Sequence, residues 1–178
     1  MKDIAFHITD ITENSIRAGA SEVRVGIAAE GSELTISISD NGRGMSAETI
    51  EKATNPFYTT RKVGLGLPFL IQNAEQSGGN VKIESQLGVG TTVKALFMLD
   101  NIDCPAVGDI AETMMLIMTG NPDINTVFSV SNVTAEFEIS TEDIKEAVDG
   151  IPIGHPEIAV MVRDIISGNI KEVMDGKI

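Results

Sequence analysis

The chain has 178 residues, 42% of them hydrophobic, which is enough for one ordinary domain and a small second one with a packed core. Its 26 acidic and 13 basic residues give a net charge of -13, so nucleic acids and anionic membranes are repelled and are not expected partners. A single cysteine excludes an internal disulfide and fits a reducing compartment. No signal-peptide pattern and no bilayer-length apolar run is present, so we expect a soluble, cytoplasmic protein.

The first hundred residues combine helical and strand periodicity. Ile4, Ile8 and Ile11 recur at helical spacing, and Gly19 follows as a stop signal, which predicts a helix over 3–18. We then expect two strands over 21–30 and 32–40, a short helical piece with a loop over 45–63, and a second helix over 65–77. Two closing strands are expected over 80–85 and 90–99. We therefore expect helices packed on one face of a mixed sheet.

The character of the sequence changes near Asp100, where we expect a domain boundary. The first domain would occupy 1–100, and a small α+β domain of unrecognised type would occupy 101–178. Thr141 is expected to cap one of its helices. We expect a helix over 105–119 and then a hairpin of two strands over 126–130 and 133–139. Two more helices are expected over 142–149 and 156–175. Partner binding is our hypothesis for this part of the chain.

Polar residues share one face of the first expected helix. Asp10 and Asn14 are four positions apart, and Arg17 follows about one turn later. An amide oxygen with an acid and a cation nearby suits a hydrated magnesium ion and its phosphates. Taken alone, the pattern is explained more simply by solvated side chains that border an apolar stripe.

A glycine pair precedes the second expected helix, in TTRKVGLGL. Gly64 and Gly66 bracket Leu65, so free backbone N–H groups can face an anion at the positive end of the helix. Arg61 and Lys62 add cations to a chain that is otherwise strongly acidic. Alone, the pair also fits a plain loop-to-helix junction, and it is neither a Walker A loop nor a dinucleotide-binding fingerprint.

The stretch SDNGRGM follows an alternating strand pattern and begins at residue 39. Its Asp40 can only accept hydrogen bonds when ionised, which suits the exocyclic amine of a purine. Gly42 and Gly44 would let a flat ring lie close to the backbone. On its own, Asp-Asn-Gly at a strand end is typical of a turn.

Taken in this order, the motifs resemble those of the GHKL superfamily of gyrase, the large heat-shock chaperones, histidine kinases and MutL proteins. DITENSIRAGA is similar to the N-box, DNGRGM to the D-x-G-x-G box, and PFYTTRKVGLGLPFL to the lid and second glycine box. SGGNVKIESQLGVGTTVKALF resembles the closing strands of a histidine-kinase catalytic domain. The resemblance covers about residues 4–99. It implies a Bergerat-type α/β (α+β) two-layer sandwich that binds ATP and magnesium.

The resemblance also implies a role for each matching position. Asn14 would hold magnesium, Arg17 would contact phosphate oxygens, and Asp40 would bind the adenine amine. Thr91, with Thr92 as the alternative, would reach the adenine through water. The other positions expected to contact the nucleotide are Gly42, Gly44, Met45, Arg61, Lys62, Gly64, Leu65, Gly66 and Leu67.

Two departures from the family pattern bear on the activity. Members that hydrolyse ATP usually carry glutamate where this chain has Asp10, which is one methylene shorter. We therefore expect weak or absent intrinsic ATPase activity, although Asp10 stays the candidate general base. A histidine kinase also needs a phosphoacceptor histidine on a preceding helical hairpin, which we do not expect here. His7 lies inside the motif helix, and His155 is typical of a helix N-terminus.

The leading hypothesis is phosphotransfer from ATP in trans to a partner protein in a regulatory or signalling role, as in the anti-sigma-factor serine kinases of the same superfamily. One alternative is a nucleotide-gated interaction switch, in which ATP orders the lid and little chemistry follows. Another is a slow ATPase whose cycle opens and closes a dimer. An unidentified protein partner is expected, and a homodimer is left open.

Overall fold

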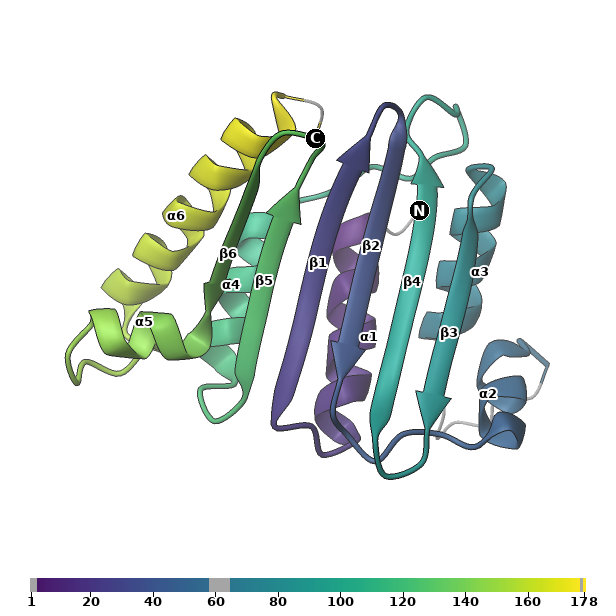
Figure 1. The fold of residues 1–178 in the computed structure, drawn as a ribbon, viewed down its shortest axis with the longest axis horizontal. Coiled ribbons are helices and arrows are strands. Elements are labelled where there is room, and N and C mark those ends of the chain that lie inside the picture. The colour runs from purple at the N-terminus through teal and green to yellow at the C-terminus, as the bar shows by residue number, and fades with distance from the viewer. Residues whose placement is uncertain (1–2, 58–64, 177) are drawn as a thin grey trace.

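The computed structural model describes residues 3–57, 65–176 and 178. Within them, six strands form one sheet in the order β3-β4-β2-β1-β5-β6, with helices packed on one face (Figure 1). The strands are β1 Glu22–Glu30, β2 Glu33–Asp40, β3 Asn80–Gln86, β4 Gly90–Met98, β5 Asn125–Ser131 and β6 Glu136–Ser140. The helices are α1 Ile4–Arg17, α2 Ala47–Thr54, α3 Gly66–Gln76, α4 Ile110–Gly120, α5 Thr141–Ala147 and α6 Pro156–Met174. The expected two-layer α/β fold with a mixed sheet is confirmed.

The sheet is mixed because β1 pairs in two different senses. β1 and β2 are antiparallel neighbours joined by a tight turn, and Val25 pairs with Ile38. On its other side β1 pairs with β5 in parallel, so that Val25 also pairs with Phe128. The other neighbouring pairs are antiparallel. Strand β1 is therefore a central strand, and its alternate side chains facing the helices are buried.

Residues beyond Asp100 extend the same sheet and the same core. α4 packs against α1, and α6 packs against α4, β5 and β6. One hydrophobic cluster contains Ile4 and Val25 from the first part of the chain together with Met114 and Val162 from the second. The domain division near residue 100 stays a prediction, and the structure adds that both parts share one sheet. None of the described helices is long and apolar enough to cross a membrane.

Two helix starts differ from the sequence-based predictions. Helix α4 begins at Ile110 rather than near residue 105, because the chain before it is hydrogen bonded to the start of α1. There the carbonyls of residues 106 and 107 accept hydrogen bonds of 2.9 Å from the first N–H groups of α1. Helix α5 is capped by Ser140 rather than Thr141, since Ser140 and Asp143 form a reciprocal capping box.

Candidate functional site

Asp40 ends β2 beside β4, where Thr91 is its cross-strand partner. Its Oδ2 accepts a 2.6 Å hydrogen bond from Ser15 Oγ of α1, and its Oδ1 accepts one of 2.8 Å from the Gly42 N–H. An ionised carboxylate offers about four acceptor positions, so further donors can still bind. The structure thus brings Asp40 and Thr91 together and holds the carboxylate in a defined orientation.

The loop after β2 is tied to the elements on both sides of it. The Arg43 N–H donates to the Ala18 carbonyl at the end of α1 over 3.0 Å. The Gly88 N–H of the β3–β4 turn donates to the Arg43 carbonyl over 2.8 Å, and the Met45 N–H donates to Ser85 Oγ over 2.7 Å. The loop is therefore anchored between α1 and the β3–β4 hairpin.

The two glycines of this loop are needed by the packing of the protein itself. A Cβ on Gly42 would lie 2.9 Å from the Cβ of Ala18 and 3.0 Å from Asp40 Oδ1. Gly44 has φ of +66°, in the left-handed region, and a Cβ there would collide with the Gln86 carbonyl oxygen. Both glycines therefore bring backbone segments close together, and their contact with a flat ring stays a prediction.

The predicted magnesium and phosphate side chains lie on α1. Asn14 and Arg17 are exposed, and Arg17 Nη2 lies 2.9 Å from Glu13 Oε2 in a surface ion pair. Asp10 lies against the first residue of α3, because a Cβ added to Gly66 would be 2.9 Å from Asp10 Oδ2. Asp10 is thus next to a helix N-terminus, where the helix dipole favours negative charge. The structure brings the N-box helix and the second glycine box together.

The remaining predicted positions of the second glycine box have different surroundings. Leu65 is 44% exposed and directly precedes α3, whereas Leu67 is buried in the core. Arg61, Lys62 and Gly64 lie outside the described residues. In the described part of this motif, the accessible features are therefore the half-exposed side chain of Leu65 and the start of α3.

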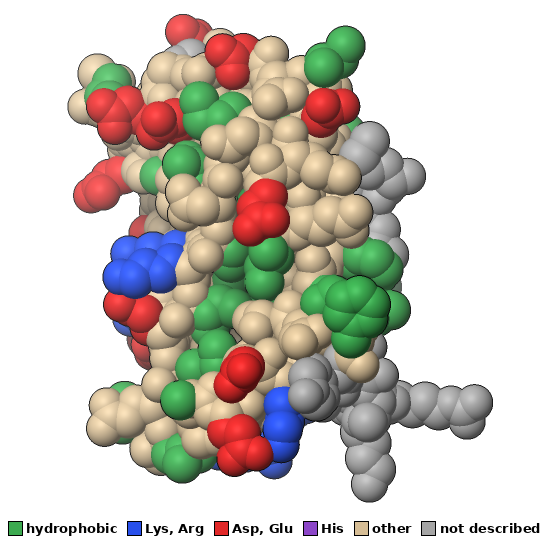
Figure 2. Space-filling view, turned by 90° about the vertical axis from the view of Figure 1, so that its right-hand side faces the viewer, with side chains coloured by type: hydrophobic (Ala, Val, Ile, Leu, Met, Phe, Trp, Pro, Cys, Tyr) green, Lys and Arg blue, Asp and Glu red, His purple; other side chains and the backbone are tan. Residues whose placement is uncertain are grey.

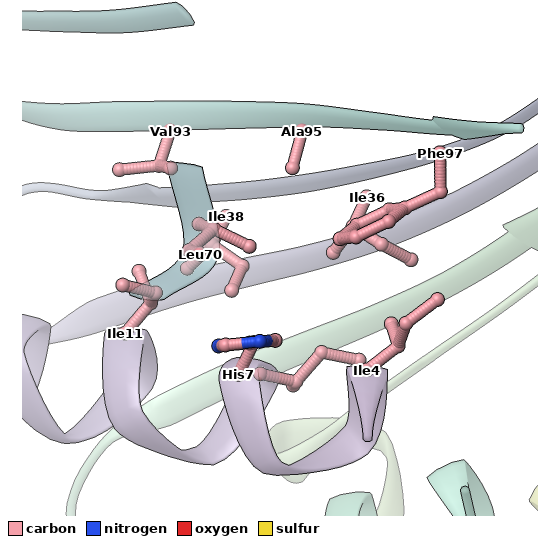
Figure 3. Close-up of a pocket in the computed structure, with 10 residues that line it drawn as sticks. Ile4, His7, Ile11, Ile36, Ile38, Leu70, Val93, Ala95 and Phe97 are labelled. Carbon is pink, nitrogen blue, oxygen red and sulfur yellow. The ribbon is translucent and has the colours of Figure 1, made fainter. Parts of the chain in front are cut away.

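A small void of about 10 Å³ lies between α1, α3 and the sheet (Figure 3). That volume is at the lower limit for one water molecule. His7 lies at this void, and its Nε2 is 2.8 Å from Asn73 Nδ2 of α3. The hydrophobic side chains that line it come from both layers, and those labelled in Figure 3 point toward one another. They are Ile4, Ile11, Ile36, Ile38, Leu70, Val93, Ala95 and Phe97, and Ile8 also lines the void.

The polar residues of the site continue the rows of side chains that line this void. Ser15 stands one helical turn beyond a void residue of α1. On β2, Asp40 lies two residues from a side chain that lines the void and on the same face of the strand. Thr91 lies in the same relation to a lining side chain of β4. The interior between helices and sheet is therefore apolar along most of its length and becomes polar where these three residues meet.

Two residues that shape the site were not predicted from the sequence. Ser15 is 3% exposed, and a buried serine one turn after Ile11 requires a hydrogen-bond partner, which was the available signal. Asn41 Oδ1 accepts hydrogen bonds of 2.9 and 3.0 Å from the N–H groups of Ser21 and Glu22. Asn41 thus fixes the chain between α1 and β1 beside Asp40.

A metal at this site would not be held by a cage of protein ligands. Within the described ranges, no group of three or more His, Cys, Asp and Glu side chains could hold a metal ion. Magnesium is commonly bound by one or two side chains together with substrate phosphates and water. The exposed amide of Asn14 fits that mode of binding.

Residues 3–101 match the family model described as histidine kinase-, DNA gyrase B-, and HSP90-like ATPase. The chain belongs to this ATPase family. Sporulation kinase C of Bacillus subtilis (strain 168) is 33% identical over 94 residues, which are 51% of this chain and 22% of that protein. The chain therefore carries an ATPase domain of the histidine-kinase type, and it spans about a fifth of the length of this relative.

Two solved structures share the fold of this chain. The N terminal domain of a DNA repair protein superposes with a TM-score of 0.59 at 16% identity, covering 86% of this chain and 59% of that chain. The Aquifex aeolicus MutL ATPase domain complexed with ADP gives a TM-score of 0.52 at 19% identity, covering 84% of this chain and 68% of that chain. These identities are low, so the likeness concerns the fold alone.

Proposed function

We propose that this chain binds ATP with magnesium and transfers the γ-phosphoryl group to a partner protein. The observation that supports nucleotide binding is the position of Asp40. Its carboxylate accepts hydrogen bonds from Ser15 and Gly42, and the residue pairs across the strands with Thr91. A purine amine is a hydrogen-bond donor, and the carboxylate retains acceptor positions for it. Thr91 would assist through water. The match to an ATPase family with kinase members supports this use of the site.

The exposed side of α1 would hold the phosphates and the metal. Asn14 would bind magnesium, which when bound would neutralise part of the phosphate charge. Arg17 would contact phosphate oxygens after leaving its ion pair with Glu13. Exposed pairs of this kind contribute at most about 1 kcal/mol, so opening it is a small obstacle. The local cations would thus offset the acidic character of the whole chain.

A phosphoacceptor on another protein is favoured by the surroundings of the two histidines. His7 is 2% exposed and hydrogen bonded to Asn73, so a phosphoryl group would have to enter the core to reach it. His155 is exposed at the start of α6, and α4 lies between α6 and α1 (Figure 1). We propose an acceptor on a cytoplasmic partner in a regulatory or signalling role, with a homodimer as a further hypothesis.

A partly apolar groove favours a second candidate, the nucleotide-gated interaction switch. The groove has a volume of about 620 Å³, and Pro56, Leu65 and Phe69 are among its lining residues. Phe57, next to Pro56 in the chain, is 95% exposed, and hydrophobic side chains gather on this side of the molecule (Figure 2). The groove adjoins the second glycine box in sequence, so nucleotide and partner would involve neighbouring residues.

Calorimetric titration with ADP and with a non-hydrolysable ATP analogue, with and without magnesium, tests the nucleotide site. We expect magnesium-dependent binding by the wild type that is weakened in Asp40→Asn. No binding at millimolar nucleotide would contradict the proposal. Incubation with γ-labelled ATP then separates the two candidates. Label on a co-purifying protein supports phosphotransfer, whereas nucleotide-dependent association without label supports the switch.

A further inference from the structure

Strand β6 is an edge strand, and its outer side has hydrogen-bonding groups that β5 does not use. The Asn132 N–H donates to the Ala135 carbonyl over 2.9 Å at the hairpin turn, which fixes the alternation of the antiparallel ladder. The odd-numbered residues of β6 therefore bond to β5. Glu136 and Glu138 direct their N–H and C=O groups outward. The N–H of Ser140, also directed away from β5, is satisfied by Asp143.

Helix α6 leaves hydrophobic side chains uncovered beside this edge. It lies at the outer end of the helix layer and packs against β6 (Figure 1). Arg163 approaches Glu112 of α4 to 4.0 Å, so that flank of α6 faces α4. Met161 and Ile165 lie on the opposite flank and are 36% and 37% exposed. A strand added outside β6 would therefore lie over these two side chains.

The charges on β6 select the kind of strand that could pair there. Glu136 and Glu138 are exposed on the open face of the sheet and form no ion pair within the part of the chain that the structure describes. Antiparallel pairing of two copies of β6 would set these carboxylates opposite one another, which is destabilising. The net charge of -13 adds to that repulsion. A second copy is thus disfavoured, and a basic strand is favoured.

We propose that the outer edge of β6 binds one extended segment of another protein, in which Lys or Arg alternates with aliphatic residues. Its backbone would pair with Glu136 and Glu138, its cations would lie beside their carboxylates, and its aliphatic side chains would cover Met161 and Ile165. The surface is built by residues after Asp100, away from the proposed nucleotide site. The proposal therefore stands independently of ATP binding.

The test uses a short capped peptide of alternating valine and lysine, titrated into the full chain and followed by calorimetry and backbone NMR. We expect saturable binding with shifts confined to β6 and to Met161 and Ile165. Glu138→Pro removes one outward N–H without touching the β5 ladder, and we expect about tenfold weaker binding. Glu138→Gln is the matched control, which keeps the N–H and should bind more tightly than the proline variant.

A second variant keeps the test decisive if proline disturbs the strand. Met161→Gln leaves β6 unchanged and removes part of the apolar surface, so weaker peptide binding is expected with an unaltered thermal transition. The proposal is overturned by no saturable binding at millimolar peptide, or by equal binding of a peptide with glutamate in place of lysine. Self-association of the wild type through β6, measured by sedimentation, would overturn it in favour of a second copy.

Discussion

The Ser15 hydroxyl donates a 2.6 Å hydrogen bond to Asp40 and so joins the last turn of α1 to the end of β2. Ser15 is nearly fully buried, and Gly42 holds the other carboxylate oxygen. Hydrogen bonds to an ionised acceptor are shorter and stronger than neutral ones. The acid at the centre of the proposed site is therefore oriented by the protein before any ligand arrives, which lowers the cost of binding.

Asp40→Asn should weaken adenine nucleotide binding by roughly 1.5–3 kcal/mol, because a charged hydrogen-bond acceptor is lost from a partly buried site. Calorimetric titration with ADP measures the effect. Ser15→Ala is the matched control: it keeps the charge, frees the orientation of the carboxylate, and should weaken binding less. Unchanged affinity in Asp40→Asn would mean that the base is not bound there.

Asn14→Ala should remove the magnesium dependence of nucleotide binding and leave ADP binding partly intact, since the amide is the proposed metal ligand. Titrations with and without magnesium measure the difference. Glu13→Gln releases Arg17 from its ion pair and should preserve the magnesium dependence. An undiminished response to magnesium in Asn14→Ala would assign the metal to another residue.

The wild type should hydrolyse ATP slowly or not at all, because the carboxylate of Asp10 is shorter than the usual glutamate. Asp10→Glu extends that reach and should raise the steady-state rate of phosphate release. Asp10→Asn should leave a slow wild-type rate little changed. Turnover comparable to efficient ATPases, abolished in Asp10→Asn, would show instead that the aspartate already acts as general base.

Gly44→Ala should destabilise the fold by roughly 2–4 kcal/mol, combining a left-handed backbone with a collision against the Gln86 carbonyl. Gly31→Ala is the matched control: its φ is +59°, but nothing lies within 4 Å of the added Cβ. That variant should lose only about 1–2 kcal/mol. Urea unfolding monitored by circular dichroism measures both, and equal losses would exclude the close approach at Gly44.

The capping box of α5 should make a pH-dependent contribution to stability. The hydrogen bond from the Ser140 hydroxyl, with a second from its N–H, holds the pKa of Asp143 below its usual range. A lowered folded-state pKa stabilises the protein above the unfolded pKa, and this contribution is lost as pH falls through the folded value. Asp143→Asn should therefore cost about 0.5–1 kcal/mol at neutral pH.

Thermal unfolding of Asp143→Asn and wild type between pH 7 and pH 2 checks this expectation. The difference between them should shrink as pH falls below the ordinary aspartate range and through the lowered pKa of Asp143. Glu142→Gln removes a charge from the same turn but keeps the capping box, so its effect should be smaller. A difference of constant size across the whole range would contradict a role for the ionised carboxylate.

Local patterns predicted most of the secondary structure, and some of the errors lie where distant segments meet. The alternation of Leu34, Ile36 and Ile38 predicted β2, because one face of that strand packs on the core. The start of α4 was misplaced because residues 106 and 107 bond to α1 instead of forming a helical turn. The hydrogen bond of Ser15 to Asp40 was missed for a similar reason, since Asp40 lies on another element.

The sequence by itself determined the strands and helices of the first hundred residues and the motifs of the ATPase family, because periodicity and motifs depend on residues close together in the chain. Only the tertiary structure decided that Ser15 meets Asp40, that Asp10 lies against α3, and that β5 joins β1. It also decided which side of β6 stays open. These outcomes follow from packing between segments far apart in the chain, which local patterns do not encode.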